Sequence, residues 1–193
     1  MAGLLRELLV RLRLALILTL ALAAARCLAA SGTEPRYSFQ HYGAETGLEN
    51  ASILSLLQDK AGYLWVGTES GLYRYEGSRF RLVGAADGLA CLAEIRGLAE
   101  AEDGSLWVIA CNHLYRSAAG RFELATRRDF AVDSLQGITG DGDGGVLVGI
   151  RDGILQGSSK RSQLGSLVVR MLPLPERERG KPVHGVYCDG KTL

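Results

Sequence analysis

The sequence predicts an all-β fold in which short strands recur in repeated units. A polar turn followed by an apolar strand with a central tryptophan occurs at residues 59–68, and the same plan returns at residues 103–108. Trp65 and Trp107 occupy corresponding positions of these two copies, and a weaker copy with leucine in place of tryptophan follows at residues 143–149. The chain also contains 25 glycines, which suits many tight turns. Several short strands in each period of about 40 residues indicate a β-propeller.

Each unit is expected to contain four strands. They are predicted at residues 53–58, 64–68, 72–75 and 80–82 in the first unit, at 95–99, 106–110, 114–116 and 122–124 in the second, and at 135–139, 146–150, 154–156 and 167–169 in the third. Ahead of them, residues 37–42 alternate like a strand and residues 45–48 form a turn. The prediction is therefore an incomplete propeller of about three four-stranded blades.

The blade repeats are expected at about 47–87, 88–129 and 130–170, within a propeller domain at residues 31–193. An incomplete fourth repeat at 180–193 would begin with a strand at 184–187, and its pattern stops before the tryptophan-type strand. Because propellers close with four to eight blades, the chain is interpreted as the N-terminal fragment of a longer protein. The last blade would then present an exposed edge.

Both faces of the expected strands are apolar. In the strand 64–68, Leu64 and Val66 lie on one face and Trp65 and Gly67 on the other. A sheet wetted on one side would alternate apolar with polar residues, so these sheets must be covered on both sides. The repeat core is predicted to comprise Trp65, Gly67, Trp107, Leu147 and Gly149, with the indoles packing in the core and not stacking on a ligand. Gly67 indicates close approach of a neighbouring backbone or indole.

The N-terminus has the pattern of an export signal. Arg6, Arg11 and Arg13 precede an uncharged apolar run at residues 14–25. This run is too short to cross a bilayer as a helix but fits the apolar region of a signal peptide. Residues 1–30 are therefore predicted to be a helical signal peptide, with an uncleaved membrane anchor as the alternative. The basic flank disfavours a buried core helix.

The charge balance argues against nucleic acid as a partner. The full chain has 22 basic and 21 acidic residues, and without residues 1–30 the balance is 18 to 20. The exported part therefore has no basic field to attract phosphate groups.

Motifs with chemical meaning are scarce, so no catalytic residue, metal site or cofactor is expected. His41, His113 and His184 lie in different units without the short spacing of metal ligands. Residues 141–145 resemble a calcium loop faintly but lack the later bidentate glutamate, and a hairpin turn is favoured. Asp59, Asp103 and Asp189 are interpreted as turn formers at equivalent positions of the repeat.

The cysteines leave two alternatives open. After removal of residues 1–30, Cys91, Cys111 and Cys188 remain. Export permits a disulfide, and Cys91 and Cys111 flank the first two strands of one unit. They form either a disulfide or two buried thiols, and Cys188 is then left over.

Several segments resemble the two-component regulator propeller repeats. The resemblance rests on residues 39–42, 45–48, 57–68 and 71–80, and it extends over residues 37–193. It is strongest in the first unit. The second unit departs from the usual Gly-Thr at Ile109-Ala110-Cys111, and the later units match weakly.

The resemblance implies the periplasmic input domain of a bacterial sensor. Such proteins join an exported propeller to a membrane helix and a cytoplasmic output domain, mostly a histidine kinase and sometimes a diguanylate cyclase. The implied partners are a small ligand, which is a polysaccharide fragment in several relatives, and the remaining propeller blades. A homodimeric parent, tethered to the inner membrane, is among the implied arrangements. Contact with the membrane is expected only through the N-terminal segment or the missing C-terminal part.

Two other classes of function remain as alternatives. One is an exported propeller enzyme, such as a glycan or small-molecule lyase, with catalytic groups on loops around the central channel. The other is a structural interaction scaffold. Because a fold does not define a function, the sequence does not decide among the three.

Overall fold

The computed structural model of the chain describes residues 37–126, 137–150, 153–161, 167–178, 183 and 186–188, together with positions 3, 6, 11, 13–17 and 19. It divides into two compact units, Met1–His41 and Tyr42–Leu193. The described positions from 3 to 19 are helical. Within the described residues, no helix has both the length and the apolar character needed to span a bilayer. The signal peptide lies mostly outside the described residues and stays a prediction.

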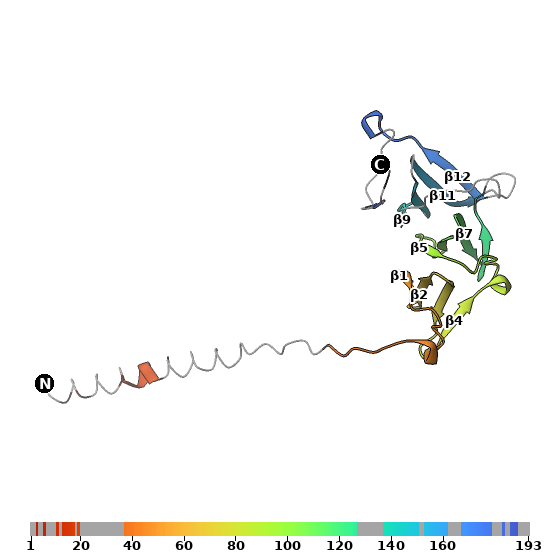
Figure 1. Cartoon of the computed structure of the whole chain (residues 1–193). Coiled ribbons are helices and arrows are strands. Elements are labelled where there is room, and N and C mark those ends of the chain that lie inside the picture. The colour runs from red at the N-terminus through yellow and green to blue at the C-terminus, as the bar shows by residue number, and fades with distance from the viewer. Residues whose placement is uncertain are drawn as a thin grey trace. The chain divides into compact units, whose positions relative to one another are not determined.

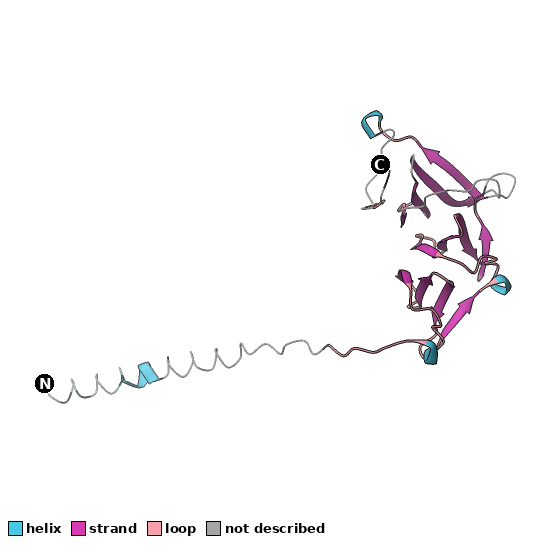
Figure 2. Ribbon diagram, in the orientation of Figure 1, coloured by secondary structure: helices cyan, strands magenta, loops and turns pink. Residues whose placement is uncertain are grey.

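The described residues of the second unit form three four-stranded antiparallel sheets, each made of strands that are consecutive in the chain (Figure 2). Blade 1 comprises β1 (Ile53–Gln58), β2 (Leu64–Thr68), β3 (Gly71–Tyr75) and β4 (Phe80–Val83). Blade 2 comprises β5 (Ile95–Glu100), β6 (Leu106–Ala110), β7 (His113–Ala118) and β8 (Arg121–Leu124). Blade 3 comprises β9 (Gly137–Gly140), β10 (Gly145–Ile150), β11 (Gly153–Arg161) and β12 (Leu167–Leu172). Three short 3₁₀ helices are η1 (Ala44–Thr46), η2 (Ala85–Asp87) and η3 (Glu176–Glu178).

The blades are arranged as the sequence predicts. Figure 1 shows β1, β5 and β9 along the same side of the three sheets, and β5 packs against both β1 and β9. The first strand of each blade is thus its inner strand, and the fourth is its outer strand. The all-β, incomplete propeller of three four-stranded blades is confirmed.

Three segments differ from their expected structure. Residues 37–42 are in no strand, because no neighbouring strand among the described residues pairs with them. β11 continues to Arg161 instead of ending at residue 156, since it pairs with β12 over most of its length. Residues 186–187 of the expected fourth repeat are also in no strand, whereas residues 184–185 lie outside the described residues.

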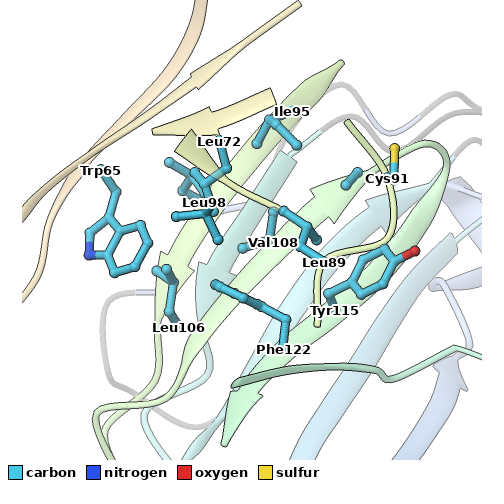
Figure 3. Close-up of a cluster of buried hydrophobic side chains, with 12 residues drawn as sticks. Trp65, Leu72, Leu89, Cys91, Ile95, Leu98, Leu106, Val108, Tyr115 and Phe122 are labelled. Atoms are coloured by element: carbon cyan, nitrogen blue, oxygen red, sulfur yellow. The ribbon is translucent and has the colours of Figure 1, made fainter. Parts of the chain in front are cut away.

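Blades 1 and 2 bury one apolar core between them. Blade 1 contributes Trp65, Leu72 and Val83, and Trp65 is only 8% exposed. Blade 2 contributes the side chains that face these three residues, and Figure 3 shows Trp65 and Leu72 beside them. Its contribution to this core is Ile95, Leu98, Leu106, Val108, Ala110, Tyr115 and Phe122. The size of the core agrees with sheets that must be covered on both faces.

Trp107 packs between blades 2 and 3 as Trp65 packs between blades 1 and 2. Its side chain is fully buried in a second core with Val146, Val148 and Leu155 of blade 3. A Cβ atom added at Gly157 would lie 2.8 Å from the indole Cζ3 atom. The glycine on β11 therefore makes room for the tryptophan of the preceding blade. Leu147 and Gly149 of blade 3 are buried as well.

Gly67 allows blade 2 to approach the inner part of blade 1. A Cβ atom at Gly67 would lie 2.8 Å from the carbonyl oxygen of Ile95. The same carbonyl accepts a hydrogen bond from Ser55 Oγ at 3.0 Å. The close neighbours are thus the Ser55 hydroxyl of the same blade and the side chain and backbone of Ile95 on β5, and not an indole.

The polar turn before β2 holds the indole of Trp65. Asp59 Oδ2 accepts a hydrogen bond from Trp65 Nε1 at 2.7 Å, and Asp59 Oδ1 accepts one from the Tyr63 backbone N–H at 2.8 Å. One carboxylate therefore closes the turn and satisfies the only polar atom of a buried indole.

The other blades form this turn with different residues. In blade 2, Trp107 Nε1 donates to Ser105 Oγ at 3.1 Å, and Ser105 Oγ donates to Asp103 Oδ1 at 2.6 Å. In blade 3, Asp141 Oδ1 accepts from the Gly145 N–H at 2.8 Å, and Asp141 Oδ2 accepts from Gln156 Nε2 at 3.0 Å.

The expected equivalence of Asp59 and Asp103 is wrong. Leu57 pairs with Trp65 and Ala99 pairs with Trp107, so the residue of blade 2 that corresponds to Asp59 is Ala101. Both aspartates do form turns, but Asp103 reaches its indole through a serine. Asp189 lies outside the described residues.

Replacing Trp107 by alanine should lower the free energy of unfolding by about 3–5 kcal/mol, because it leaves a cavity between two blades. Urea unfolding followed by circular dichroism measures the loss. Tyr187, an aromatic residue that is 86% exposed, provides the control, since Tyr187→Ala should change stability by less than about 0.5 kcal/mol. Equal effects of the two substitutions would contradict the packing role.

Asp59→Ala should destabilise the chain by about 1–3 kcal/mol, because the Trp65 N–H and the turn lose their acceptor. The control is Asp143→Ala, which removes an exposed carboxylate from the corresponding turn of blade 3. Thermal unfolding of the two variants should differ, and an unchanged midpoint for Asp59→Ala would refute the indole anchor.

Candidate functional site

The two ends of the blades differ in how their polar groups are used. Because consecutive strands are antiparallel, the hairpins alternate between the ends of each blade. One end, the turn end, carries the β1–β2, β5–β6 and β9–β10 turns. The other, the connection end, carries the β2–β3 and β6–β7 hairpins together with residues 43–52 and 84–94, which lead into β1 and β5.

The polar groups of the turn end bind mainly to one another. Lys60 Nζ donates to the carbonyl oxygens of Ala101 at 3.4 Å and Glu102 at 3.0 Å. The Lys60 N–H donates to Glu100 Oε2 at 2.8 Å. These contacts, together with the carboxylate-bound turns described above, hold blade 1 to blade 2.

At the connection end, two loops of each of the first two blades are linked to each other. In blade 2, Cys91 and Cys111 form a disulfide with a Cα–Cα distance of 6.3 Å. In blade 1, Asn50 Nδ2 donates to Ser70 Oγ at 2.6 Å. Both links join the segment before the inner strand to the hairpin after the second strand. Sequence reasoning missed the Asn50 link, although Asn50 precedes Cys91 by about one repeat length.

The segment before β5 is held by a hydrogen bond and an ion pair. The Gly84 N–H donates to Asp87 Oδ2 at 3.0 Å, and Arg81 Nη1 lies 3.0 Å from Asp87 Oδ1. The Gly84 hydrogen bond, with the Arg81 charge, holds the pKa of Asp87 below its ordinary value despite partial burial. Leu89 then enters the core with no exposed surface. The connection is therefore a rigid support for the residues around it.

Exposed polar side chains gather on this support and form the candidate recognition surface. Its members are Glu49, Asn50, Glu69, Ser70 and Asn112, of which Asn50 is half-buried and the others are exposed. Asn112 has a φ of 59°, a left-handed conformation that asparagine tolerates better than most residues. Loops held by a rigid scaffold are where binding residues concentrate.

Neither His41 nor His113 lies in a cluster of metal-ligating side chains among the described residues. Within the described part of the chain, no group of three or more His, Cys, Asp or Glu side chains could hold a metal ion. His113 Nδ1 lies 2.7 Å from the carbonyl oxygen of Cys111, within its own hairpin. His184 lies outside the described residues. Asp141 serves the turn before β10, as a hairpin residue would.

Mass spectrometry should detect one free thiol in residues 31–193 before reduction and three after it, because the structure joins Cys91 and Cys111. Replacing both by alanine should lower stability by about 3 kcal/mol, the value for a closed loop of about 20 residues. Three free thiols in the untreated exported protein would contradict the disulfide.

Comparison with known proteins gives one family match. Residues 47–70 match the family described as two component regulator propeller. This range contains β1 and β2, with Trp65 and its turn. A stretch of 46 residues is 37% identical to "Histidine kinase P4" of Formosa agariphila, and it covers 24% of this chain and 3% of that protein.

Solved structures share the fold. The extracellular domain of a protein described as a hybrid two component system of B. thetaiotaomicron superposes with a TM-score of 0.55 and 22% identity, over 69% of this chain and 20% of that one. A second B. thetaiotaomicron extracellular domain, described as from a one component system, gives 0.60 and 18%, over 77% and 20%. Virginiamycin B lyase from Staphylococcus aureus gives 0.53 and 13%, over 74% and 47%.

The chain thus spans about a fifth of each of the two extracellular domains and 3% of the histidine kinase. The family match lies on the unit with the strongest tryptophan motif, and the fold likeness covers 69% and 77% of this chain. The chain therefore carries a repeat of the two component regulator propeller family, set in a propeller fold shared with extracellular domains of bacterial signalling proteins.

Proposed function

We propose that this chain is part of the exported, ligand-sensing propeller of a bacterial signal-transduction protein, with a two-component sensor histidine kinase as the parent. The observation that carries the proposal is the family match at residues 47–70, which falls on a complete turn, strand and indole anchor of blade 1. The short resemblance to a histidine kinase supports the choice of output. The export pattern of residues 1–30 supports a periplasmic location with the parent tethered to the inner membrane.

The candidate recognition surface at the connection end is the proposed contact for the ligand. Its amide, hydroxyl and carboxylate groups offer both donors and acceptors, with Glu49 and Glu69 as its charged members. Such a surface suits a polar ligand rich in hydroxyl groups and repels an anionic one. An uncharged oligosaccharide is therefore the proposed ligand class.

Signalling would follow from a difference in affinity. A ligand shifts a conformational equilibrium only to the extent that it binds one arrangement more tightly than the other. The connection end is suited to this task, because Asn112 of the proposed surface lies in the hairpin that the Cys91–Cys111 disulfide joins to residues 84–94, the connection between blades 1 and 2. A ligand that spans two connections would favour one relative position of the blades.

The test is thermal unfolding of the exported region with a panel of uncharged and sulfated oligosaccharides. One uncharged member should raise the unfolding midpoint, because binding to the folded state alone stabilises it. Glu69→Ala should reduce this shift, whereas Glu102→Ala, an exposed residue of the turn end, should leave it intact. A shift that is lost only in the turn-end variant would place the ligand elsewhere and refute the proposed surface.

An exported lyase is the second candidate, favoured only by the fold likeness to virginiamycin B lyase. Catalysis would require acid and base groups on loops around the inner strands. Degradation of a glycan or a cyclic peptide by the purified exported region would favour the enzyme over the sensor. A propeller that binds only other proteins would instead indicate an interaction scaffold.

A further inference from the structure

The inner strand of blade 1 contains a β-bulge near the connection end. The pairing of β1 with β2 shifts between Ile53 and Ser55, so Leu54 is an extra residue that has no partner of its own in β2. A bulge of this kind turns a side chain away from the regular alternation of the strand. Leu54 is 40% exposed although it is apolar.

The inner strand of blade 2 contains the same bulge at the same position. The pairing of β5 with β6 shifts between Ile95 and Gly97, and Arg96 is the extra residue. Ile95 and Gly97 are buried, and Arg96 is the one exposed residue of β5. The bulge therefore carries a charged side chain out of a strand that is otherwise packed between blades.

The sequence keeps the neighbours of the extra residue and changes the extra residue itself. An apolar residue, a variable residue and a serine or glycine follow one another at 53–55, 95–97, 135–137 and 183–185. The variable residue is Leu54 or Arg96 in the two bulges, and Gln136 and His184 have the corresponding places in the sequence, outside the described residues. Packing restricts the type of a buried side chain but not that of an exposed one. The position is therefore available for recognition.

The two bulges are held next to each other. Ser55 Oγ donates a hydrogen bond to the carbonyl oxygen of Ile95 at 3.0 Å, and each of these residues is bonded directly to an extra residue. The link crosses from blade 1 to blade 2, since β1 packs against β5. Leu54 and Arg96 are therefore fixed on one rigid part of the inner side of the blades.

The bulges also adjoin the candidate recognition surface. The bulge of β1 begins opposite Thr68, the residue before Glu69. The bulge of β5 begins opposite Ala110, two residues before Asn112. The recognition surface therefore continues from the hairpins of the connection end to the extra residues of the inner strands.

Arg96 is paired with a carboxylate on the same segment. Its Nη2 atom lies 2.8 Å from Glu94 Oε2, and the two side chains are 45% and 43% exposed. An exposed ion pair of this kind contributes little to stability. It does present N–H donors beside carboxylate acceptors without a net charge. Neighbouring hydroxyl groups of a sugar can use both, because each hydroxyl donates and accepts hydrogen bonds.

We propose that Arg96, Glu94 and Leu54 form the inner half of the ligand site. The ion pair binds two neighbouring hydroxyl groups of one sugar residue, and Leu54 packs against the C–H groups of the same sugar. This inference rests on the proposed function and adds the residues that select the sugar. Arg96 suits the task because its planar guanidinium can donate to two oxygen atoms at once. A sulfated sugar is disfavoured, since its anionic group would have to displace Glu94 from Arg96.

Titration calorimetry of the exported region tests the inner half, with the uncharged oligosaccharide that raises the unfolding midpoint as the probe. Arg96→Ala should weaken its binding by about tenfold or more, because hydrogen bonds of a charged group are lost. Leu54→Ala should weaken binding to a smaller extent, since it removes only apolar contact. Arg79→Ala is the control and should leave binding unchanged, because it removes an exposed arginine from the β3–β4 turn at the turn end.

The inner half and the proposed function fail in different ways. Unchanged binding in Arg96→Ala, together with weakened binding in Glu69→Ala, overturns the inner half and keeps the proposed function. Weakened binding in Arg96→Ala but not in Glu69→Ala supports the inner half and refutes the outer surface. If no oligosaccharide of the panel binds, both are overturned.

A second measurement needs no substitution and so does not depend on the folding of a variant. Phenylglyoxal modifies accessible arginine side chains, and mass spectrometry locates the modified residues. The bound oligosaccharide should slow the modification of Arg96 and leave that of Arg79 unchanged. Equal rates at Arg96 with and without the oligosaccharide would show that the ligand does not cover this guanidinium.

Discussion

Contact between neighbouring sheets is the constraint on which the rest of this structure depends. Each blade has two apolar faces, and a sheet of four short strands cannot bury both by itself. Blade 1 offers Trp65 and Leu72 to blade 2, and blade 2 offers Trp107 to blade 3. Two glycines follow from the same constraint, because Gly67 leaves room for Ser55 and for Ile95 of β5, and Gly157 leaves room for the indole of Trp107.

Equivalent positions of the repeat meet equivalent physical demands with different chemistry. The indole N–H finds its acceptor directly in Asp59 in blade 1, and through Ser105 in blade 2. The two loops of the connection end are linked by the Asn50–Ser70 hydrogen bond in one blade and by a disulfide in the next. What the repeat preserves is a spatial requirement, namely a satisfied buried donor or a tethered loop, and several residue types can meet it.

In the proposed function, the two ends of the blades have different tasks. At the turn end, Lys60 and the turn carboxylates bind groups of the same chain and hold neighbouring blades together. At the connection end, the short linked loops leave Glu69 and Asn112 exposed on a rigid base. A sensor needs firm contacts between blades as well as exposed polar groups. A ligand can favour one arrangement of the blades only if its binding energy moves whole blades and is not absorbed by local changes in the loops.

The sequence by itself determined the fold class, the repeat period and most strand positions, because apolar runs separated by glycine turns are local patterns. β1, β2 and β6 begin and end where these patterns place them. Only the tertiary structure decided what each strand faces. The equivalence of Asp59 and Ala101 depends on strand register. Ile95, which lies close to Gly67, belongs to the next blade, and whether residues 37–42 form a strand depends on a neighbouring strand. Such contacts join residues that are far apart in the sequence, such as Gly67 and Ile95, and no local pattern specifies which of them meet.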